Sequence, residues 1–173
     1  MEGGGRSAGI GEWVLLSYRL PREPSTPRIA LWRQLKRLGV AQVGDGLVAL
    51  PADARTREQL EWLAEQVLEG GGTAGVWLAR PGTLAQERAL AVEMAAARAV
   101  EYSALVAHAA ALMQEASDRT RAVPRLRRRW REITRRDFFP PPERDVAAAA
   151  LRGLVEGAGP QAAAAPDSKG VLA

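Results

Sequence analysis

Residues 41–79, AQVGDGLVALPADARTREQLEWLAEQVLEGGGTAGVWLA, decide the fold of this chain. Two short apolar runs flank Gly44-Asp45-Gly46, a pattern typical of the tight turn of a β-hairpin. After the hairpin, Asp53 can N-cap a helix, which Gly70–Gly72 then end. TAGVWLA (73–79) follows as another strand. The apolar side of the predicted helix carries Leu60, Leu63, Val67 and Leu68.

The residues before this stretch add one strand and one helix. WVLLSYRL (13–20) is short and apolar, which is typical of a strand. Ser25 or Thr26 can then N-cap a helix that Gly39 ends as a left-handed cap. Over residues 13–79 the order is therefore βαββαβ, the split βαβ arrangement of ferredoxin-like domains. The apolar positions at helical spacing in this first helix are Ile29, Leu31, Trp32, Leu35 and Leu38.

The residues after this stretch are predicted to be helical. Residues 84–117 contain no Gly or Pro, and such a helix would be about 50 Å long. Since a small domain cannot cover that length, we expect the helix to project or to pair with a second protomer, as in a homodimer. Its near-heptad stripe is Leu84, Ala91, Val92, Ala95, Ala99, Tyr102, Val106, Ala109 and Met113.

Two further helices complete the prediction. Pro124 opens one, with Leu126, Trp130 and Ile133 on one side, and the last runs from Pro142 or Glu143 to about Val155. The fold class is therefore α+β. We expect a ferredoxin-like domain over residues 12–80, followed by a helical extension over residues 83–156. Residues 1–11 are predicted to be disordered and residues 157–173 to form a flexible tail.

Composition limits the chemistry. The chain has no Cys and a single His, His108, which argues against thiol chemistry and a transition-metal site. His108 is expected to be a surface or packing residue. No nucleotide-binding Gly-rich loop opens a helix, which disfavours a reductase. We therefore expect no catalytic residues, no cofactor and no metal. The lack of a membrane-length apolar run and of a signal-peptide pattern leads us to expect a cytoplasmic protein.

The positive charge is uneven. The net charge is +4, 22 of the 24 basic residues are Arg, and nine of these lie between Arg119 and Arg136. Arg forms bidentate contacts with phosphates and other oxyanions. A GC-rich genome would also enrich Arg over Lys, so composition alone leaves both explanations open.

One candidate anion site lies where the first helix begins. A helix N-terminus offers unpaired N–H groups and a partial positive charge, which favour oxyanions such as phosphate. The alternative is a capped helix with solvated arginines. The residues that would form the site are Arg22, Ser25, Thr26 and Arg28.

Two basic groups are candidates for contact with nucleic acid. The first lies on the predicted exposed side of the first helix, opposite Trp32 and Leu35, and the second avoids the apolar side of the helix that follows Pro124. Trp130 keeps helical spacing with the apolar residues of that helix, so we interpret it as a core residue. The alternatives for the two groups are an ordinary charged face and a salt-paired face. Their members are Arg33, Lys36 and Arg37, and Arg127, Arg128, Arg131 and Arg135.

Several segments carry a resemblance to a known family. LPREPSTPRIALWRQLKRLGV (20–40), ARAVEYSALVAHAAALMQEA (97–116) and LRRRWREITRRDFFPPPERDVAAAAL (126–151) resemble the N-terminal region of the ChrB chromate-resistance family, and RRDFF (135–139) is the most distinctive piece. The resemblance spans roughly residues 12–155. It implies a chromate-responsive transcriptional regulator or an accessory protein that binds DNA. Full-length members carry a further C-terminal domain.

The first 80 residues also resemble the central domain of PaaX-type repressors and the small CRISPR adaptation endoribonucleases. Those nucleases place a metal-binding Asp at the end of the first strand, where this chain has Tyr18-Arg19-Leu20. A metal-dependent nuclease is therefore a remote alternative. A non-catalytic interaction module that binds a protein partner and no DNA is the main rival of the regulator hypothesis.

Overall fold

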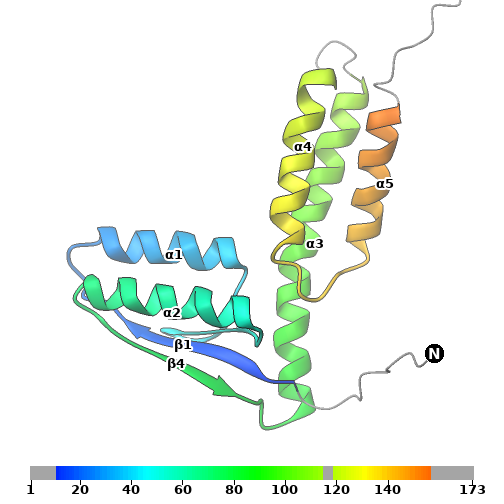
Figure 1. Ribbon diagram of the computed structural model, residues 1–173. Helices are drawn as coiled ribbons and strands as arrows, with labels where there is room; N and C mark the ends of the chain where they lie inside the picture. The colour runs from blue at the N-terminus through cyan, green and yellow to red at the C-terminus, as the bar shows by residue number, and fades with distance from the viewer. Residues whose placement is uncertain (1–10, 115–118, 157–173) are drawn as a thin grey trace, which may run out of the picture.

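The computed structural model describes residues 11–114 and 119–156 (Figure 1). The predicted flexible tail and, apart from Gly11, the predicted disordered N-terminus lie outside the described residues, as do residues 115–117, the last that were predicted for the long helix.

Four strands form one antiparallel sheet. They are β1 (Trp13–Arg19), β2 (Ala41–Gly44), β3 (Leu47–Pro51) and β4 (Thr73–Ala79), in the spatial order β2-β3-β1-β4. Each neighbouring pair is antiparallel. With two helices between the strands, this is the split βαβ topology, so the predicted α+β fold with a ferredoxin-like unit is confirmed.

The local signals that predicted these elements have clear geometric counterparts. Gly46 has a positive φ of 69°, and its carbonyl accepts a hydrogen bond from the Tyr18 backbone N–H. The Asp53 carboxylate accepts from the Thr56 backbone N–H at 2.7 Å, while the Thr56 hydroxyl accepts from the Asp53 N–H, which completes a capping box. The hairpin turn and the start of the second helix are thereby fixed by short-range contacts.

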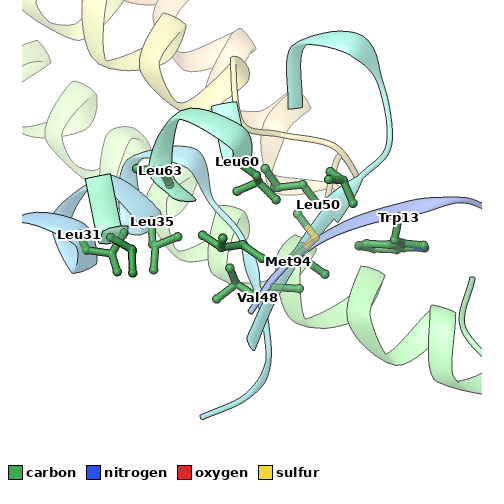
Figure 2. Close-up of a cluster of buried hydrophobic side chains, with 13 residues drawn as sticks. Trp13, Leu31, Leu35, Val48, Leu50, Leu60, Leu63 and Met94 are labelled. Carbon is green, nitrogen blue, oxygen red and sulfur yellow. The ribbon is translucent and has the colours of Figure 1, made fainter. Parts of the chain in front are cut away.

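Two helices cover one face of the sheet. Helices α1 (Thr26–Leu38) and α2 (Ala54–Glu69) lie over the same side in Figure 1. Because opposite residues in an antiparallel register share a face, β1 and β3 present one apolar row to these helices. Figure 2 shows the resulting core. Its buried members include Val14, Leu16, Leu31, Leu35, Val48, Leu50, Leu60 and Leu63.

The apolar sides predicted for these helices were partly wrong. Ile29, Trp32 and Leu68 are exposed, with Trp32 at 55%. In α1 only the row through Leu31 and Leu35 is buried, and Trp32 lies about 100° further round the helix. Trp32 therefore lies toward solvent with the basic residues rather than opposite them.

The second face of the sheet is covered at one end. Helix α3 (Leu84–Gln114) packs there: Met94 joins the core cluster that contains Ala41 and Ala49, and the Trp13 indole N–H donates to Glu87 Oε1 at 3.3 Å. At the other end Trp77 is 60% exposed, and its N–H donates to the Ser17 hydroxyl at 3.0 Å. The later part of the chain thus supplies only a partial cover.

The C-terminal half of α3 packs with α4 (Arg119–Thr134) and α5 (Glu143–Glu156) in a small helical bundle (Figure 1). Its buried side chains form a second cluster, separate from the sheet core. The predicted start of α4 was wrong, because Pro124 lies inside the helix: a proline removes one backbone donor without forcing a helix to begin there. The cluster contains Tyr102, Leu105, Leu112, Leu126, Ile133, Ala147, Leu151 and Leu154.

The buried row of α3 agrees with the predicted stripe at Tyr102 and Ala109 and differs from it elsewhere. It runs through Met94, Arg98, Tyr102 and Leu105, whereas Val92 is 67% exposed. A charged residue holds one of the buried positions, so a pattern of apolar residues alone places the row about one residue off. Helices α4 and α5 cover the C-terminal half of α3 within the same chain, so this helix does not need a second protomer to cover it. The homodimer therefore stays a prediction. Within the described residues, no helix is long and apolar enough to cross a membrane.

Candidate functional site

The predicted anion-binding residues lie at the N-terminal end of α1, where two shallow grooves meet. Ser25 and Arg28 line one groove of about 510 Å³, and Arg22 and Arg28 line the other, of about 840 Å³. Thr26 is exposed in the first turn but lines neither groove. Ser25 occupies the N-cap position, yet within the described residues its side chain makes no capping hydrogen bond. The structure therefore brings three of the four residues together.

Sequence reasoning missed two further residues of this end. Arg19 and Tyr18 also line the larger groove, opposite Asp45. Burial, followed by the negative charge of Asp45, raises the pKa of the Tyr18 hydroxyl above its ordinary value, so it stays protonated at neutral pH. The sequence does contain a signal for these two residues, because β1 is apolar except at its end, where they stand.

The basic residues of the outer face of α1 are exposed as predicted. Arg33, Lys36 and Arg37 all face solvent, and the Lys36 ammonium lies 4.2 Å from the centre of the Trp32 ring. This cation–π contact partly explains why Trp32 lies at the surface, because its partner Lys36 is charged and faces solvent.

The outer face of α4 is the densest basic surface of the described chain. Arg127, Arg128 and Arg131 are exposed, and helical geometry places them within an arc of about 100°. Arg128 lies 3.8 Å from Glu132, with both side chains more than half exposed, so this pair is weak. Trp130 instead packs on Tyr102, with 5.3 Å between ring centroids, which agrees with its interpretation as a core residue.

A cleft of about 570 Å³ joins the two predicted basic groups. Arg37 at the end of α1 and Arg135 just after α4 both line it, together with Arg55 from the first turn of α2 and Arg136. The other lining residues are Leu38, Gln59, Glu132 and Phe138. The sequence analysis assigned Arg37 and Arg135 to separate groups and missed Arg55 and Arg136. Nothing local in the sequence connects these positions, because the cleft depends on how α4 packs against the ferredoxin-like unit.

The RRDFF segment fastens the helical bundle to the ferredoxin-like unit. Phe139 stacks on Trp13 with 5.9 Å between ring centroids, and the Arg55 guanidinium lies 5.7 Å from the centre of the Phe138 ring. Arg136 and Asp137 enter a charged network that starts on α3. The most distinctive part of the resemblance therefore connects the two parts of the structure, and we call this segment, residues 135–139, the clasp.

That network is buried beside the clasp. Arg98 and Arg136 both pair with Glu101, at 3.0 and 2.6 Å. The Tyr102 hydroxyl donates to Asp137 Oδ2 at 2.8 Å, and Arg144 lies 3.7 Å from the same oxygen. Burial lowers the pKa of Arg98, opposed chiefly by Glu101, and raises the pKa of Tyr102, reinforced by its hydrogen bond to Asp137. The charged side chains of this network pair with one another, as is expected of a network that stabilises the fold.

Neither the single histidine nor the end of β1 belongs to a cluster of metal-ligating side chains in the described part of the chain. His108 is exposed on α3. Across residues 11–114 and 119–156, no group of three or more His, Asp and Glu side chains is arranged to hold a metal ion. The end of β1 presents Tyr18 and Arg19 where the adaptation nucleases carry their acid.

Comparison with known proteins gives one family. The family model described as "Protein ChrB, N-terminal" matches residues 28–160, a span that includes most of the ferredoxin-like unit and the whole described bundle. No curated protein and no solved structure matches the chain.

Proposed function

The chain belongs to the ChrB N-terminal family, which links it to chromate resistance, and on that premise we propose that it is a non-catalytic regulator or accessory protein that binds DNA through its arginine-rich surface. The observation that carries the proposal is the α4 face. Three of its exposed arginines, Arg127, Arg128 and Arg131, share one arc, and within the described residues their acidic partner is Glu132, in a weak pair with Arg128.

Such a face suits phosphates better than bases. Guanidinium groups pair with phosphate oxygens in bidentate geometry, and each neutralised phosphate releases counterions from the duplex. The aromatic residue of the helix, Trp130, is packed on Tyr102 and is not available for base stacking. We therefore expect binding that depends strongly on salt, with backbone contacts dominating on this helix.

The groove at the N-terminal end of α1 is the proposed position for chromate or a similar oxyanion. Arg22 and Arg28 line it, and Arg28 lies in the first turn of α1, near the positive end of the helix. An anion there would offset this unfavourable charge. The two sites lie on different parts of the chain, so effector and DNA could bind together.

A mobility-shift experiment on the DNA upstream of the gene, with and without chromate, tests the proposal. We expect a shift at sub-micromolar protein that chromate weakens, and that added salt abolishes. Absence of binding at low salt, for a protein shown to be folded, would count against a DNA-binding role.

A protein-interaction module is the second candidate. Three tryptophans, Trp32, Trp62 and Trp77, are each more than half exposed, and exposed aromatic residues are enriched at protein interfaces. This candidate leads if DNA binding fails.

A further inference from the structure

The cleft between the ferredoxin-like unit and α4 gathers more positive charge than its surroundings neutralise. Four arginines line it, and of the described lining residues one, Glu132, is acidic. Glu132 lies 3.8 Å from Arg128, outside the cleft lining, so its charge is shared. Arg136 is paired with Glu101. Three of the four arginines that line this cleft of about 570 Å³, namely Arg37, Arg55 and Arg135, therefore have little acidic compensation among its described lining residues.

Helix electrostatics explain two of these three charges but not the third. Arg37 and Arg135 lie at the C-terminal ends of α1 and α4, where a cation is favourable. Arg55 lies in the first turn of α2, which reads Ala54-Arg55-Thr56, at the positive end of that helix. A cation at this position lowers helix stability, so its placement calls for another reason.

Arg55 is also held in position. Its Nη1 donates to the Arg135 carbonyl at 3.3 Å, and its guanidinium lies over the Phe138 ring at 5.7 Å. Arg136 is held by its 2.6 Å pair with Glu101. The Arg55 guanidinium, which Glu101 does not neutralise, is thus oriented before any ligand arrives, which reduces the entropy lost on binding.

We propose that this cleft binds a phosphate group. Its volume lies within the range of small-ligand sites, and arginine is the side chain that pairs with phosphate oxygens in bidentate geometry. The phosphate could belong to the DNA backbone, in which case the proposal deepens the proposed function and rests on it, or to a free phosphate compound. Because the lining comes from both units, bound phosphate also bridges the ferredoxin-like unit and the helical bundle.

The test uses the full chain and the double variant R55Q/R135Q. Both residues are exposed, so the fold should survive, and R135Q alone serves if the double variant does not fold. The control is R57Q/R152Q, which removes the same charge from exposed positions on α2 and α5 outside the cleft. Pyrophosphate at constant ionic strength is titrated in one arm, with the melting temperature as readout. The other arm titrates a short synthetic DNA duplex by fluorescence anisotropy.

We expect pyrophosphate to raise the melting temperature of the wild type, since a ligand that binds only the folded state stabilises it. R55Q/R135Q should bind at least about tenfold more weakly than the control, as for the removal of charge-assisted hydrogen bonds. Weakening in both arms or in the DNA arm alone identifies a backbone phosphate, and weakening in the pyrophosphate arm alone identifies a free compound.

The proposal is overturned if the cleft variant and the control bind both probes equally. If the wild type binds no DNA, the proposed function fails, but the pyrophosphate titration still tests whether the cleft binds phosphate. The absence of binding to both probes by the wild type overturns both proposals.

Discussion

The arginines of the network beside the clasp and those of the outer face of α4 are chemically identical but have different roles. Arg98 is 7% exposed and is tied to Glu101, whereas Arg127 and Arg131 face solvent. In the sequence Arg98 stands alone among alanines, while the α4 arginines form the densest basic run. The density of a charge pattern therefore indicates exposure, and an isolated charge on an apolar helix can be a buried structural residue.

The largest effect should come from the buried side of this comparison. Arg98→Ala removes one of the two partners of Glu101 and opens space beside Gly39, so it should cost about 3 kcal/mol of unfolding free energy, the lower end for breaking a buried pair because Arg136 stays paired with Glu101. Urea denaturation measures this. Arg129→Ala, an exposed residue of α4, is the control and should change the value by less than about 0.5 kcal/mol. Equal decreases in the two variants would remove the distinction.

Trp130 tests whether the aromatic residue inside the basic run belongs to the core. Trp130→Ala removes the packing on Tyr102 and should destabilise the protein by about 3 kcal/mol. The melting temperature should fall, while DNA affinity measured well below that temperature should stay the same. A variant of unchanged stability that no longer binds DNA would instead make Trp130 a stacking residue.

Tyr102 provides a smaller, pH-dependent effect. Tyr102→Phe removes the donor to Asp137, whose side chain is fully buried, and should cost roughly 1–3 kcal/mol. The pKa of Tyr102 lies above its ordinary value of 10.0, so the folded state holds the proton more tightly than the unfolded chain. The contribution is complete below about pH 10 and disappears as the pH rises through the folded-state pKa.

The difference in unfolding free energy between wild type and Tyr102→Phe should accordingly shrink above about pH 10. Denaturation near neutral pH and at the highest pH that leaves the protein folded measures it. A constant difference would show that the hydroxyl is no more strongly protonated in the folded state.

Short-range signals predicted the ferredoxin-like unit well. The Gly44-Asp45-Gly46 turn, the Asp53 cap and the Gly39 cap each depend on neighbours in sequence, and each is confirmed. The errors concern long-range packing. Trp32 fits an apolar stripe yet is exposed, and Arg98 breaks the stripe of α3 yet is buried, because its partner Glu101 and the clasp decide its environment.

The candidate sites show the same limit. The exposed arginines of α4 follow from helical spacing and were predicted from the sequence. Arg55 and Arg136 were not, because the cleft exists only where α2 and the end of α4 meet. A residue's place in such a cleft is a property of the tertiary fold.

The smallest expected change in stability, and the most direct test of the proposed function, belongs to the exposed side of the comparison. Replacing Arg127, Arg128 and Arg131 together by Ala should leave the unfolding free energy almost unchanged, since exposed Arg contributes little. It should weaken binding to specific and non-specific DNA by similar factors, because phosphate contacts carry no sequence information.

The decisive measurement is the slope of log affinity against log salt for the wild type and this triple variant. The proposed function predicts a slope that flattens by about 0.9 for each phosphate that the variant no longer neutralises, together with weaker binding at low salt. An unchanged affinity with an unchanged slope, in a variant that is fully folded, would contradict the role of α4 in DNA binding and would favour the protein-interaction module.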